Sequence, residues 1–193
     1  APMIEAGLWY RPSYYPKIGE DNWLQSCNRE VVNVRQSGGI CDVSTLGKIE
    51  FHGKDTAKFL DFVYTNSFSS LAVGRVRYGL MLREDGFIMD DGTSARIAEN
   101  SYLMTTTTAA AGSVMRHLDF IHQAYCPKLH VRFVSVTEQW AQFSVSGPKS
   151  PDIISSIVDE PFNETDWPFM ACGEVKVTVS YTHLTLPTNI GVG

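Results

Sequence analysis

Two adjacent acids, Asp90 and Asp91, follow the apolar run Phe87-Ile88-Met89. A carboxylate beside buried apolar residues costs free energy unless it is paired or used. An acid in such a place can accept a proton or stabilise a cation that develops during a reaction. The competing interpretation is a solvated turn at the end of a strand. The pattern by itself leaves both interpretations open.

Other residue patterns that carry chemistry point away from the common kinds of site. The sequence has no G-x-G-x-x-G, no Walker A motif and no G-x-S-x-G, so nucleotide binding and serine hydrolysis have no support. His117 and His122 are five residues apart and do not share a helix face as metal ligands would. The four cysteines form no C-x-x-C pair, so we predict no metal site and interpret them as reduced, mostly buried thiols: Cys27, Cys41, Cys126 and Cys172.

Charge and composition exclude further classes of function. The 193 residues have a net charge of -5 with Lys and Arg scattered along the chain, whereas a nucleic-acid surface needs clustered positive charge. We find no signal peptide and no apolar run long enough to span a membrane. We therefore expect a cytoplasmic protein with neither nucleic acid nor membrane as a partner.

The elements that position the acids follow from hydrophobic periodicity and turn residues. The pattern predicts an α+β protein, in which a mostly antiparallel sheet carries packed helices. Helices are expected within 19–39, 54–66, 109–126 and 148–158. Strands are expected within 47–53, 73–84, 87–99, 102–108, 130–136 and 140–147. Residues 1–16, rich in proline and aromatics, are expected to be extended.

The periodicity also predicts which helix faces are buried. For the helix in 54–66 the predicted face is Phe59, Leu60, Phe62 and Val63. For the helix in 109–126 it is Val114, Met115, Leu118, Phe120, Ile121 and Ala124. In the first helix, Trp23, Leu24, Cys27, Val31, Val32 and Val34 recur at roughly helical spacing.

Four stretches carry a resemblance to a known family: "GICDVSTLGKIEFHGKDTAKFLDFVYTN", "VGRVRYGLMLREDGFIMDDG", "YLMTTTT" and "VTEQWAQFSVSGPKS". In order and spacing they resemble the aminomethyltransferase-like part of sarcosine oxidase alpha subunits, and more widely the glycine-cleavage T-protein (GcvT) superfamily. The match covers nearly all of residues 7–178. The resemblance implies a GcvT-like folate-binding fold, which we expect to be truncated here.

The resemblance also implies a site. Asp90 would be the catalytic carboxylate in a tetrahydrofolate pocket, with Asp91 as its structural neighbour. Tyr78 and Leu46 would line the slot for the pterin and aminobenzoate groups, and Thr106 would lie on the strand that closes the pocket. The chemistry would be methylene transfer, in which an anion orients the folate amine and accepts its proton. After Asp91 this chain has "GTSAR" in place of an apolar strand, which weakens any carry-over of T-protein contacts beyond Asp91.

The parent enzyme implied by the resemblance is larger than this chain. A flavin-bearing beta subunit would oxidise sarcosine, with smaller subunits completing a heterotetramer, and flavin and NAD would bind outside this chain. The imine product would pass its carbon to tetrahydrofolate to form 5,10-methylenetetrahydrofolate. Two alternatives remain open: the folate domain of dimethylglycine oxidase or dehydrogenase, and a non-catalytic folate-binding regulatory homologue.

The ends of the chain lead to an expectation about domain organisation. We expect residues 1–19 to be an arm from a preceding region and residues 20–178 to be an incomplete folate-binding domain. The run "VSYTHLTLPT" at 179–188 matches the translation of a sequencing-library adapter, so we expect 179–193 to be adapter read-through. We expect the chain alone to be inactive.

Overall fold

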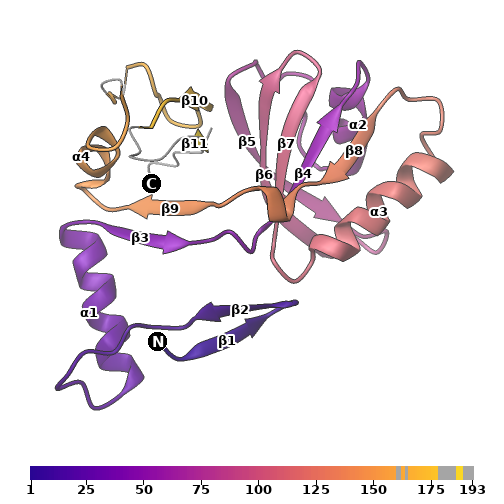
Figure 1. The fold of residues 1–193 in the computed structure, drawn as a ribbon. Helices are drawn as coiled ribbons and strands as arrows, with labels where there is room; N and C mark the ends of the chain where they lie inside the picture. The colour runs from indigo at the N-terminus through magenta and orange to yellow at the C-terminus, as the bar shows by residue number, and fades with distance from the viewer. Residues whose placement is uncertain (160–161, 164, 178–185, 189–193) are drawn as a thin grey trace.

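The computed structural model describes residues 1–159, 162–163, 165–177 and 186–188 (Figure 1). Its centre is a five-stranded antiparallel sheet in the order β5-β6-β7-β4-β8. The strands are β4 (Gly47–His52), β5 (Arg75–Leu82), β6 (Ile88–Ala98), β7 (Ser101–Thr106) and β8 (Arg132–Ser135). The predicted α+β class and the predicted meander β5-β6-β7 are confirmed.

The two faces of this sheet have different surroundings. Alternation along the strands puts Met81, Asp90, Met104 and Ile49 on one face, here called the helix face. Helices α2 (Thr56–Val63) and α3 (Ala111–Ala124) pack on it and complete the core. The main core side chains from these helices are Phe59, Leu60, Val63, Val114, Leu118 and Ile121.

The predicted helix faces were too broad. Phe62 is 57% exposed and Phe120 is 51% exposed, and Ala124 is also exposed. A short helix against a sheet buries only a narrow stripe of residues three and four apart. Phe62 and Phe120 instead each contact the ring of Tyr125, with centroids 6.3 and 5.7 Å apart.

A second, smaller layer lies over the opposite face of the sheet. Strand β3 (Gly39–Asp42) pairs antiparallel with β9 (Phe143–Ser146), and the two run side by side in Figure 1. The 3-10 helix η1 (Thr137–Gln139) precedes β9, and α4 (Ser150–Ser155) follows it. β9 and α4 were predicted, whereas β3 was missed.

Two further strand pairings were missed as well. The N-terminal arm forms a hairpin of β1 (Met3–Ala6) and β2 (Trp9–Pro12). Strand β10 (Gly173–Val175) pairs with β11 (Leu186–Thr188). Apart from 186–188, the segment expected to be adapter read-through, 179–193, lies outside the described residues.

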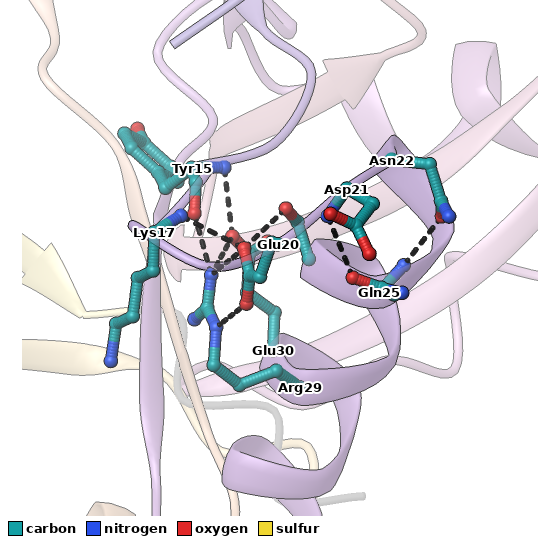
Figure 2. Close-up of polar contacts among 9 residues, drawn as sticks. Tyr15, Lys17, Glu20, Asp21, Asn22, Gln25, Arg29 and Glu30 are labelled. Carbon is teal, nitrogen blue, oxygen red and sulfur yellow. Dashed lines mark hydrogen bonds and ion pairs between the residues drawn. The ribbon is translucent and has the colours of Figure 1, made fainter.

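Helix α1 (Trp23–Gln36) is held at its start by a polar network (Figure 2). Asn22 caps the helix by accepting from the amide of Gln25 at 3.1 Å. Glu20 accepts from Arg29 and from Ser26, each at 2.5 Å. These bonds lower the pKa of Glu20 from its usual 4.5 to about 2, with Arg29 the larger cause.

The apolar side of α1 is mostly open to solvent. Trp23, Leu24, Val31 and Val32 are all exposed. The helix itself was predicted correctly, but its apolar spacing does not correspond to a buried face within the described residues.

The cysteines differ in part from expectation. All four are free thiols; Cys41 is exposed and the other three are only half-buried, so the prediction of mostly buried thiols is wrong. Among the described residues, no helix is both long and apolar enough to cross a membrane.

Candidate functional site

Asp90 lies within strand β6 and not in a turn. It is 7% exposed and pairs across the ladder with Met81. Its Oδ1 accepts a hydrogen bond from Thr107 Oγ1 at 2.7 Å, and the amide of Thr107 lies 3.2 and 3.3 Å from the two carboxylate oxygens. The solvated-turn interpretation is therefore wrong for Asp90, which is buried and hydrogen-bonded.

Asp91 lies on the opposite face of the same strand. Its Oδ2 accepts a hydrogen bond from the hydroxyl of Tyr78, which pairs with Thr93, two residues along β6. Alternation puts Tyr78, Asp91, Thr105 and Lys48 on one face, here called the cavity face. Tyr78 is 48% exposed, so a ligand can reach this carboxylate–phenol pair.

The other two predicted pocket residues, Thr106 and Leu46, lie apart from Tyr78. Thr106 is 2% exposed, and its hydroxyl donates to the carbonyl oxygen of Thr107 at 3.0 Å, on the Asp90 side of the sheet. Leu46 is half-buried in the turn before β4 and donates its amide to Val43 O at 3.0 Å. The structure thus brings Thr106 close to Asp90 through Thr107, but it separates Tyr78 from both.

Glycines let the strands approach closely beside the acids. A Cβ on Gly92 would lie 2.0 Å from the carbonyl oxygen of Thr105. A Cβ on Gly79, which pairs with Gly92, would lie 2.7 Å from the ring of Tyr64. Only glycine fits these two positions, and their close packing fixes where β6 presents its two acids.

The buried phenol of Tyr64 interacts electrostatically with both acids. Burial raises the pKa of the Tyr64 phenol, and the charges of Asp90 and Asp91 raise it further. Its hydroxyl donates to Met104 Sδ at 2.7 Å. Tyr64 therefore stays protonated and acts as a hydrogen-bond donor in this part of the core.

A cavity of about 170 Å³ lies over the cavity face. Its walls come from the main sheet, from β9 and from α4, and include Lys48, Thr105, Trp140, Phe143 and Ile154. None of Asp90, Tyr78, Leu46 and Thr106 is among the described residues that line it. Sequence reasoning missed Lys48, because a lysine at the start of a predicted strand is ordinarily expected to face solvent.

The comparisons with protein families and curated proteins agree with one another. The family model described as the GCVT N-terminal domain matches residues 1–186. The sarcosine oxidase subunit alpha of Rhizobium meliloti (strain 1021) is 54% identical over 92% of this chain and 18% of its own length. The same subunit of Corynebacterium sp. (strain U-96) is 45% identical with the same coverage. An aminomethyltransferase of Staphylococcus haemolyticus is 30% identical over 85% of this chain and 42% of its own length.

A solved structure supports the fold. The glycine cleavage system aminomethyltransferase T from Bartonella henselae superposes with a TM-score of 0.74 at 19% identity, covering 89% of this chain and 43% of that chain. The predicted GcvT-like fold is confirmed by this match. The chain spans less than a fifth of the sarcosine oxidase subunits that it matches.

Proposed function

The chain belongs to the GCVT N-terminal domain family, and from that premise we propose that it forms part of the folate-binding module of a sarcosine oxidase alpha subunit. In this proposal the module receives the one-carbon imine from sarcosine oxidation and passes the carbon to tetrahydrofolate. Identities of 54% and 45% to two sarcosine oxidase alpha subunits favour this branch over a T-protein.

The observation that carries the proposal is the pair of carboxylates in β6. Asp90 is buried and held by Thr107, and Asp91 is bound by the phenol of Tyr78. Methylene transfer needs an anion beside a folate amine, because the amine gains positive charge as it attacks and must then lose a proton. Tetrahydrofolate supplies that nucleophilic amine when bound.

The two acids suit different parts of this task. The assignment of catalysis to Asp90 comes from the family resemblance. Its contacts with Thr107 fix its position, as expected of a group that must act in one orientation. Asp91 is the second candidate, because it lies on the more accessible cavity face beside Tyr78, whose ring offers a surface on which a flat heterocycle can stack.

The experiment uses a sarcosine oxidase complex whose alpha subunit carries this sequence. Asp90→Asn and Asp91→Asn keep the side-chain shape and remove the charge. We expect one of the two variants to lower sarcosine-dependent formation of 5,10-methylenetetrahydrofolate by about 100-fold or more. Oxygen consumption should change little, because sarcosine oxidation is proposed to occur at a flavin on the beta subunit.

The proposal extends to cofactors and partners. Flavin and NAD are proposed to bind elsewhere in the complex, and the beta subunit and smaller subunits to complete it. A folate domain of dimethylglycine oxidase or dehydrogenase remains the enzymatic alternative. It predicts formation of methylenetetrahydrofolate with dimethylglycine, after its oxidation, as the source of the one-carbon unit, which the same coupled assay distinguishes. A non-catalytic folate-binding homologue predicts that neither acid variant changes product formation.

A further inference from the structure

From the cavity beside β4 we infer a binding site for a small monocarboxylate with an apolar or aromatic body, in which the ammonium of Lys48 is the counterion. The inference rests on the cavity alone and not on the proposed folate chemistry. It therefore stands or falls separately from the proposed function.

Lys48 is a buried cation. The residue is 2% exposed. Its Nζ donates to the carbonyl oxygens of Ser44 and Leu46 at 2.7 and 2.8 Å, and its third donor has no partner in the part of the chain that the structure describes. Within the described residues no carboxylate forms an ion pair with it. A buried charge of this kind is costly unless an anion compensates it.

Burial of Lys48 has a measurable electrostatic consequence. It lowers the pKa of the ammonium, and the more distant charge of Asp42 offsets this only in part. A ligand carboxylate in contact with Nζ would favour the charged form and recover the lost stabilisation.

Gln142, which also lines the cavity, carries a second polar group with unused capacity. The side-chain oxygen of Gln142 is buried and has no hydrogen-bond partner within the described residues. Ser44 links the two residues. Its carbonyl oxygen accepts from Lys48 Nζ, and its hydroxyl oxygen accepts from the backbone N–H of Gln142 at 2.9 Å. Rotation of the Gln142 side-chain amide by half a turn would present its NH₂ group to the same ligand carboxylate.

The rest of the cavity is apolar. Trp140, Phe143, Ile154 and Ala95 are among the side chains that line it. Its volume is about 170 Å³, and an apolar cavity of roughly 150 Å³ is enough to bind benzene. One end therefore suits a carboxylate and the remainder suits a six-membered ring or an aliphatic group of similar size.

The test is a calorimetric titration of the chain with benzoate, and with benzamide as the uncharged molecule of the same shape. We expect benzoate to bind at least tenfold more tightly than benzamide. Lys48→Met keeps most of the apolar stem and should weaken benzoate binding by about 10-fold to 100-fold while leaving benzamide unchanged. Lys54→Met, at an exposed lysine, is the matched control and should change neither affinity.

Three results would overturn the inference: no binding of benzoate, equal binding of benzoate and benzamide, or equal effects of Lys48→Met and Lys54→Met. If Lys48→Met fails to fold, the comparison of the two ligands on the unaltered chain still decides. Gln142→Leu then provides a second variant, which should weaken benzoate binding more than benzamide binding.

Discussion

Replacing Gly92 by alanine should destabilise the main sheet more than any other glycine-to-alanine change in β5 or β6. The added Cβ would lie 2.0 Å from the carbonyl oxygen of Thr105 and 2.9 Å from its carbonyl carbon. Both atoms belong to backbone in the central part of the sheet, so rotation of a side chain cannot relieve the clash. Strands β6 and β7 would have to separate by about 1 Å or more to reach an ordinary contact distance. We place the cost at about 3 kcal/mol, the upper part of the usual range for overpacking.

Thermal unfolding followed by circular dichroism measures this cost. For a chain of this length, 3 kcal/mol corresponds to a fall in Tm of roughly 6–12 °C. Gly112→Ala is the matched control, because a Cβ there meets only the end of the Arg116 side chain at 3.9 Å, in the first turn of α3. It should leave Tm unchanged or raise it slightly. A fall in Tm of less than about 2 °C for Gly92→Ala would refute the close approach of β6 and β7.

Three further perturbations test other parts of the structure. Phe59→Ala removes a fully buried ring and should lower the free energy of unfolding by about 3–5 kcal/mol in urea titrations. Thr107→Val removes the hydroxyl that donates to Asp90 and should cost about 1–3 kcal/mol in the same titration, whereas Thr107→Ser should cost less. The pKa of Glu20 is lowered to about 2, chiefly by Arg29, so its contribution is complete above about pH 4.5 and is lost as the pH falls toward 2. The protection of α1 amides from exchange, relative to the intrinsic rate at each pH, should fall over that range, and Glu20→Gln should abolish the step.

Local signals in the sequence were sufficient for the helices and the meander. The turn at Gly86 has a φ of +82°, and strands β5 and β6 lie next to each other along the chain, so hairpin chemistry and alternation predict their pairing. The stripe Phe59, Leu60 and Val63 gives the helical period directly. These features depend on residues within a few positions of one another.

Features that depend on distant residues were not predicted. Strand β3 has four residues, and its partner β9 lies about a hundred positions away, as the pairing of Gly39 with Ser146 shows. No local pattern specifies such a pairing. Lys48 was missed for the same reason: lysine usually points to solvent, and only the β9 and α4 layer, formed late in the chain, covers it.

In the candidate site, too, the local feature was predicted and the spatial arrangement was not. The sequence identified the acid pair in β6, but the period-two alternation of the strand separates the pair onto two faces. Tyr78 consequently contacts Asp91 and not Asp90. The predicted single pocket of four residues therefore becomes two environments, and the role of each acid depends on the face that a ligand occupies.

The decisive test of the proposed function compares Asp90→Asn with Asp91→Asn in the sarcosine oxidase complex. The measured quantity is 5,10-methylenetetrahydrofolate formed per molecule of oxygen consumed. We expect this ratio to fall by about 100-fold in at least one variant, while oxygen consumption persists in both. An unchanged ratio in both variants would contradict a catalytic role for the β6 carboxylates and would favour a folate-binding module without methylene transfer.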